Sequence, residues 1–180
     1  MIITVEVAVV AVVIIILLNN RGKDLSMFYR MRRASEPLVV FEFTSEPITD
    51  ADFARFLSEW ETLHAGPSPF TLLFDTTRMA IPHPKYSIKM ALFIKKIRRI
   101  EPQRLSRSLI VVQSRTIASL LELVFYLQPP VAPVYLTRGV TGAVEAVLAG
   151  ELDRSVVPAQ PLPFEVTSVI QPGEPVLWFL

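Results

Sequence analysis

Four polar residues directly follow the apolar run Phe70–Phe74 and have the best placement for chemistry in this chain. A short, almost wholly apolar run is typical of a buried strand in a mostly parallel sheet. Sheets of this kind bind ligands at the carboxyl ends of their strands. One interpretation is therefore the floor of a polar pocket. The other, which we favour, is that the aspartate accepts hydrogen bonds from nearby backbone amides and shapes the loop. The four residues are Asp75, Thr76, Thr77 and Arg78.

The two histidines are weak candidates for acid–base or metal chemistry. His83 lies between two prolines, with no second histidine or acid at ligand spacing. His64 follows a predicted helix, and the negative end of the helix dipole explains a cation there. The chain has no cysteine, which excludes disulfides, thiolate metal sites and cysteine nucleophiles. It also lacks the Gly-rich phosphate loop, the G-x-S-x-G elbow and H-E-x-x-H. We therefore predict a protein that is not an enzyme and has no cofactor or metal.

Basic residues gather on one predicted helix, over about 85–100, opposite its apolar side. They form either a solvated face that favours the C-terminal dipole or a site for an anionic surface. That surface would be an acidic partner protein or lipid headgroups, where each cation contributes about 1 kcal/mol. We predict no nucleic acid partner, because a net charge of +1 gives no global field and no aromatic platform accompanies the cations. The candidate binding residues are Lys85, Lys89, Lys96, Arg98 and Arg99.

The elements that position these residues alternate between strand and helix patterns. The order ββαβαβαβα predicts an α/β fold with a mostly parallel sheet, right-handed crossovers and helices that cover the sheet. The predicted strands are Phe28–Met31, Leu38–Phe43, Phe70–Phe74, Leu109–Val112 and Val134–Leu136. The predicted helices are a first one that Thr49 caps and His64–Pro67 ends, then Lys85–Ile100, Thr116–Leu127 and Thr141–Ala149.

Three segments of this series resemble the STAS-like family, which is related to bacterial anti-sigma-factor antagonists. They are LVVFEF, TLLFDTTRM, and SLIVVQS followed by RTIASLLELVFYLQPPVAPVYLTRGVTGAVEAVL. The resemblance covers residues 27–150 and implies a domain that binds a partner protein, in some relatives a nucleotide or lipid. In the antagonists, a serine after the central strand is phosphorylated to switch partner binding. The matching segment here, Asp75–Pro84, begins Asp-Thr-Thr-Arg in place of the usual Asp-Ser-Ser-Gly.

Residues Ile2–Leu18 form an almost unbroken aliphatic run whose one charge is Glu6. Its 17 residues reach about 25 Å as a helix, at the short end of what spans a bilayer. Basic residues follow the run and none precedes it, so the positive-inside rule places the domain in the cytoplasm or an equivalent reducing compartment. We predict a membrane-anchor helix over 1–20 and a linker over 21–26. A buried strand, or a natural start at Met27, are the alternatives.

Beyond Gly150 the prolines indicate an extended arm over 151–180, with a hairpin turning at Pro172-Gly173 as one form. Its apolar end, with Trp178 and Phe179, predicts contact with the domain itself, a partner or the membrane interface. The sequence thus predicts a single-pass, membrane-tethered interaction domain, and an accessory subunit of a membrane complex is a close variant of this prediction. The alternative is a carrier of a lipid or small ligand, resembling CRAL-TRIO domains, which would need a roomy apolar cavity.

Overall fold

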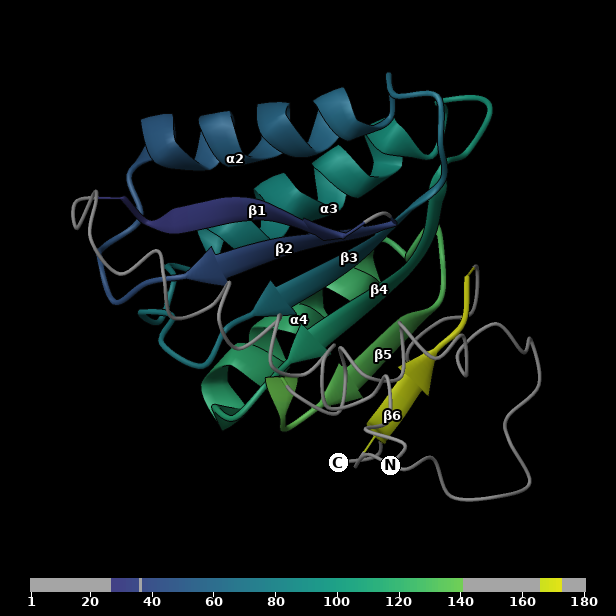
Figure 1. The fold of residues 1–180 in the computed structure, drawn as a ribbon. Helices are drawn as coiled ribbons and strands as arrows, with labels where there is room; N and C mark the ends of the chain where they lie inside the picture. Colours follow the sequence, from purple (N-terminus) through teal and green to yellow (C-terminus); the bar gives the residue numbers. More distant parts are fainter. Residues whose placement is uncertain (1–26, 36, 141–165, 173–180) are drawn as a thin grey trace, which may run out of the picture.

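The structure, a computed structural model, describes residues 27–35, 37–140 and 166–172. Within these ranges the chain forms a six-stranded sheet in the order β1-β2-β3-β4-β5-β6 (Figure 1). Strands β2 to β5 are parallel, and the edge strands β1 and β6 are antiparallel to their neighbours. The predicted α/β class and mostly parallel sheet are confirmed. The strands are β1 Tyr29–Ser35, β2 Leu38–Phe43, β3 Phe70–Asp75, β4 Leu105–Val111, β5 Val134–Thr137 and β6 Val166–Ile170.

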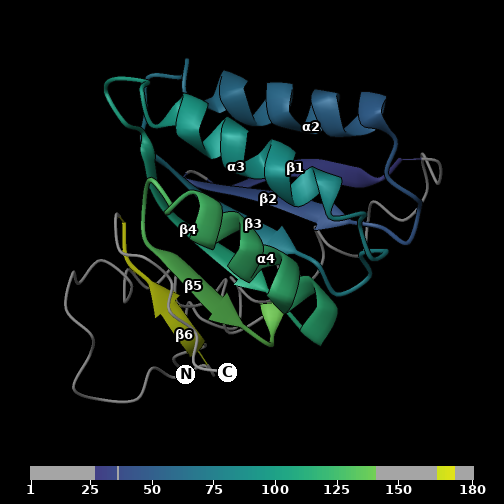
Figure 2. The ribbon, with the colours of Figure 1, turned by 180° about the vertical axis from the view of Figure 1, so that it is seen from behind.

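Three described helices connect the parallel strands: α2 Asp50–Leu63, α3 Lys85–Ile97 and α4 Arg115–Leu127. All three lie on the same face of the sheet, as the two opposite views show (Figures 1 and 2). The topology explains this, because each crossover moves one strand further in the same direction. Right-handed crossovers that advance in one direction place every helix on one face. Because β3 and β4 are parallel, the loops that follow them open at the same end of the sheet.

The core between this face and the helices is built from aromatic rings centred on Phe56 of α2, whose side chain is 1% exposed. Its ring lies 5.1 Å from that of Phe41 and 5.3 Å from that of Tyr29, in edge-to-face geometry. Alternate residues of the strands supply the sheet side of this core. Trp60 extends the cluster towards α3, with its ring 5.2 Å from that of Phe93. The helical spacing of Phe53, Phe56 and Trp60 thus places all three in the core.

Several element boundaries differ from the sequence prediction, and the shift exceeds two residues in β1, β4 and α3. Strand β1 ends at Ser35 rather than Met31. Strand β4 begins at Leu105 rather than Leu109, because main-chain pairing with β3 extends the strand through polar residues that carry no apolar pattern. Helix α3 ends at Ile97 rather than Ile100. The next turn is tightened by a hydrogen bond from the Ile100 amide to the Ile97 carbonyl, 3.1 Å long. Pro102 disfavours helical conformation in the residue before it, so the helix cannot continue.

Part of the predicted C-terminal arm belongs to the sheet. Residues Val166–Ile170 form β6 and pair with β5, Val134 opposite Ile170. The apolar stretch therefore has its hydrogen-bonding partner in the domain itself. The predicted helix Thr141–Ala149, the run Ile2–Leu18, and Trp178 and Phe179 lie outside the described residues. Among the described residues, no helix has the length and apolar character needed to cross a membrane.

Candidate functional site

The loop from β3 to α3 lies at the carboxyl edge of the sheet, as predicted, and its polar residues hold the loop together. The Asp75 carboxylate accepts hydrogen bonds from the Thr77 amide, at 3.0 Å, and the Thr77 hydroxyl, at 2.6 Å. Thr76 is buried, and its hydroxyl donates to the Val111 carbonyl at the end of β4, at 2.6 Å. Arg78 is exposed to solvent. The structure thus matches the loop-shaping interpretation of Asp75.

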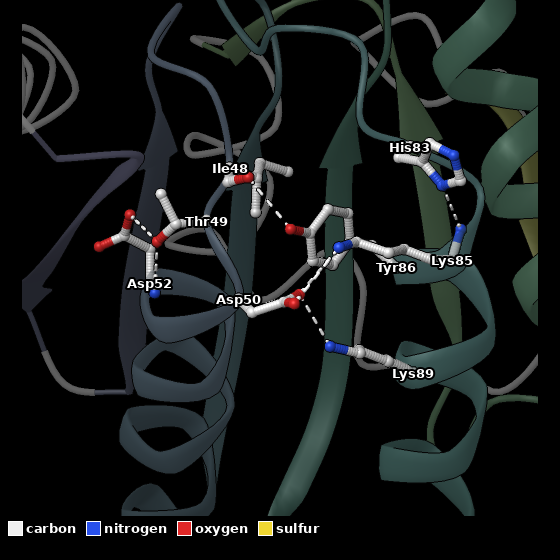
Figure 3. A network of polar contacts seen from close by, with 8 residues as sticks. All are labelled: Ile48, Thr49, Asp50, Asp52, His83, Lys85, Tyr86 and Lys89. Atoms are coloured by element: carbon white, nitrogen blue, oxygen red, sulfur yellow. Dashed lines mark hydrogen bonds and ion pairs between the residues drawn. The ribbon is translucent and has the colours of Figure 1, made fainter.

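A polar network joins the start of α2 to the start of α3 beside this loop (Figure 3). Asp50 forms ion pairs with Lys85 at 3.2 Å and Lys89 at 2.8 Å. The hydrogen bond from Lys89, followed by that from Lys85, lowers the pKa of Asp50 from 3.8 to about 2. The Tyr86 hydroxyl donates to the Ile48 carbonyl at 3.0 Å. These contacts fix the two helix starts relative to each other.

The N-terminus of α2 in the same network has the predicted cap. The Thr49 hydroxyl oxygen accepts from the Asp52 amide at 3.1 Å and donates to the Asp52 carboxylate at 2.6 Å. Side-chain capping satisfies one of the amides that have no partner inside the helix. The network therefore consists of contacts that begin helices and join them.

The histidines occupy different environments and do not approach each other in a common site. His83 is exposed, and its Nδ1 accepts a hydrogen bond from the Lys85 amide at 3.1 Å, which helps to start α3. His64 is 5% exposed, and its ring meets that of Phe70 edge to face at 5.1 Å. Burial lowers the pKa of His64, and the charge of Glu61 only partly opposes this shift. Burial thus favours the neutral ring of His64 over a cation at the helix end.

The predicted basic residues are largely engaged within the domain. Besides the two lysines on Asp50, Lys96 pairs with Glu61 of α2 at 2.6 Å. Arg98 donates to the Pro129 carbonyl after α4 at 2.6 Å. Arg99 is exposed, and no ion pair joins it to an acid within the described residues. Exposed ion pairs are weak, but these pairs direct the lysines towards the acids of α2. The lysines therefore do not form a flat cationic surface for a partner.

A different surface on α3 was missed by the sequence prediction. Ile88 is 53% exposed and Leu92 is 63% exposed, and their spacing of four residues places them on one side of the helix. Lys95 continues that side, and Arg99 follows just beyond the helix end. We call these four residues the outer stripe. The available signal was the i, i+4 spacing of Ile88 and Leu92 outside the buried stripe that contains Phe93 and Ile97.

A cavity of about 130 Å³ lies between the sheet and the helices. Its lining is almost wholly apolar and includes Phe74 of β3, Met90 and Ile94 of α3, and Leu121 of α4. The lining also includes Trp60, whose indole nitrogen is buried without a hydrogen-bond partner in the structure described. At about 24 cal/mol per Å³, an empty space of this size costs about 3 kcal/mol of folding stability. A cavity of this size and lining is a candidate site for an apolar molecule.

No family model, curated protein or solved structure matches this chain. Within the described ranges, no three His, Asp or Glu side chains lie close enough together to hold a metal ion. The candidate sites are therefore defined by their own geometry. They are the polar loop at the carboxyl edge, the outer stripe of α3 and the apolar cavity beneath the helices.

Proposed function

We propose that this protein is a membrane-tethered interaction domain of STAS-like type that acts by binding a partner protein and not by catalysis. The outer stripe is the observation that carries the proposal. A contiguous exposed apolar patch, above all one bordered by polar residues, marks an interaction site. Ile88 and Leu92 meet this description on one side of one helix.

The chemistry of the stripe defines the partner that would fit it. Its apolar half would fit an apolar groove or ridge on the partner. Lys95 and Arg99 at its other end would pair with carboxylates of the partner. An acidic rim would steer association, while the buried apolar contact would supply most of the affinity. The loop around Asp75 is held by its own hydrogen bonds, so we assign partner recognition to α3 and not to that loop.

The STAS-like assignment is supported by the order of elements and by a mostly parallel sheet whose described helices lie on one face. The tether is supported by the sequence of Ile2–Leu18 and by the basic residues after it. A domain held near the bilayer would meet partners in the same membrane at high effective concentration. An accessory subunit of a membrane complex is the form of this function that we favour.

The tether is tested in the full chain by the double variant Val10→Arg/Val13→Arg. Each arginine near the middle of a spanning helix costs about 2.5–3.5 kcal/mol. We expect the variant to leave the carbonate-resistant membrane fraction, and the matched variant Val10→Leu/Val13→Leu to stay in it. Equal membrane retention of both variants would refute the tether.

The partner surface is tested by photo-crosslinking in native membranes, with a photoreactive amino acid in place of Leu92. We expect one discrete product that Ile88→Glu abolishes. The control is Tyr126→Glu, which introduces the same charged residue in place of an exposed apolar one at the end of α4, where Tyr126 is 71% exposed. It should leave the product unchanged. A product that survives Ile88→Glu, or no product at all, would contradict the assignment to α3.

A carrier of a lipid or small ligand is the second candidate function, and the apolar cavity is the observation that favours it. None of the four outer-stripe residues lines the cavity. The two functions can therefore be tested separately.

A further inference from the structure

We propose that the cavity beneath the helices binds a small, uncharged and mostly apolar molecule that carries one hydrogen-bond acceptor. The proposal names the ligand class for the second candidate function. It depends only on the cavity, and partner binding at the outer stripe can fail without affecting it.

The size of the cavity sets the size of the ligand. Its volume is about 130 Å³, and an engineered protein cavity of about 150 Å³ with an apolar lining stays dry and binds benzene. The space therefore suits one six-membered ring with a short substituent. It is too small for a whole phospholipid or a long acyl chain.

The lining excludes a charged ligand. Most of its side chains are aromatic or aliphatic, and no Asp, Glu, Lys or Arg is among them. An ion placed there would lose its hydration and gain no partner of opposite charge. The few lining hydroxyls include that of Thr76, which already donates to the Val111 carbonyl.

Trp60 supplies the polar feature of the site. Its side chain is 6% exposed and lines the cavity, and its indole nitrogen is buried without a partner in the structure described. Buried polar groups normally have a hydrogen-bond partner. A carbonyl or ether oxygen on the ligand would accept from this N–H group. An apolar ring with one such oxygen thus matches both the lining and the unpaired donor.

The cavity wall can adapt to such a guest. Met79 and Met90 both line it, and methionine side chains change shape at little cost. Met79 belongs to the loop before α3, and Ile48 and Pro82 beside it are only partly buried. Because loops open more readily than packed helices, we assign entry to this edge of the sheet.

The test compares two probes with the same carbon skeleton, ethylbenzene and acetophenone, which differ by one carbonyl oxygen. Binding to the purified full chain is followed by the fluorescence of Trp60 in a Trp178→Phe background and by calorimetry. We expect saturable binding of both, with Kd values of about 0.1–1 mM. We expect acetophenone to bind more tightly, and Trp60→Phe to remove this preference while ethylbenzene still binds.

Occupancy is tested by filling the cavity. Ser108→Leu places a larger side chain at a lining position on β4 and should weaken both probes by at least about tenfold, or about 1.4 kcal/mol. Ser58→Leu makes the same change on the exposed side of α2 and should leave binding unchanged. If Ser108→Leu does not fold, Ala132→Leu replaces it at another lining position. Absence of saturable binding, or equal binding by the filled variants, overturns the proposal. Equal binding of the two probes to the wild type overturns the role of Trp60.

Discussion

Replacing Ser108 by valine should stabilise this protein, because the side chain lines an apolar cavity that a larger apolar group can fill. Ser108 is 3% exposed and lies on β4 opposite Leu72 of β3 and Val134 of β5. Valine exchanges the hydroxyl for one methyl group and adds a second. Valine is also a favourable residue in a strand.

The magnitude follows from the volume available. The cavity measures about 130 Å³, so two methyl groups fit without displacing the helices. At about 0.8 kcal/mol for each buried carbon group, we expect a gain of about 1.5 kcal/mol. This is about half of the 3 kcal/mol that the empty space costs at 24 cal/mol per Å³.

Urea unfolding of the full chain measures this gain. With an m value of about 1–3 kcal/mol per molar, the midpoint should rise by about 0.5–1.5 M while m stays constant. Ser58→Val on the exposed side of α2 is the matched control, and it should cost a few tenths of a kcal/mol because valine is a poorer helix former. A loss of 1 kcal/mol or more for Ser108→Val would refute the reasoning, since overpacking costs about 1–3 kcal/mol.

Three further outcomes follow from the core and the polar contacts. Phe56→Ala should cost about 3–5 kcal/mol of unfolding free energy, and Phe56→Leu should cost clearly less. Equal losses for the two variants would argue against the aromatic cluster as the main source of that loss. Because burial lowers the pKa of His64 below its ordinary 6.5, the unfolded chain binds more protons below that pH. The contribution of His64 to the free energy of unfolding is therefore full above pH 6.5 and falls as the pH drops, by at most about 1.4 kcal/mol per pH unit. His64→Leu should reduce this slope of stability against pH between pH 7 and 5. An unchanged slope would count against the burial argument. The Asp50 carboxyl should titrate near pH 2 by NMR, and in Lys85→Ala/Lys89→Ala its midpoint should return towards 3.8, so a midpoint that stays near 2 would show that the two lysines are not the cause.

Much of the fold could be predicted because its elements are encoded locally. The apolar runs of β2 and β3 were visible as strands, since a central strand is buried on both faces and needs no polar alternation. The N-cap Thr49 was visible because a side chain caps the backbone only three residues ahead. The loop role of Asp75 is equally local, because its carboxylate reaches the amide two residues on.

The candidate site was less predictable because its contacts join distant segments. The lysines of α3 were recognised as a basic stripe, yet Lys89 binds Asp50 across 39 residues of sequence and Lys96 binds Glu61 across 35. Helical periodicity gives the side of the helix on which a lysine lies, but not the acid on the neighbouring helix. The same limit applies to Leu92. Its spacing from Ile88 gives the side of the helix on which it lies, but its exposure is known only when the neighbouring elements are placed.

The sequence by itself therefore determined the series of strands and helices, the caps and the direction in which each element turns its apolar side. The tertiary structure alone decided that β6 joins the sheet beside β5, that His64 is buried so that its pKa is lowered, and that a cavity remains beneath α3 and α4. The physical reason is the range of the interactions. Backbone hydrogen bonds within helices, caps and side-chain periodicity act over a few residues. Strand addition, desolvation and packing volume depend on segments that meet only when the chain is folded.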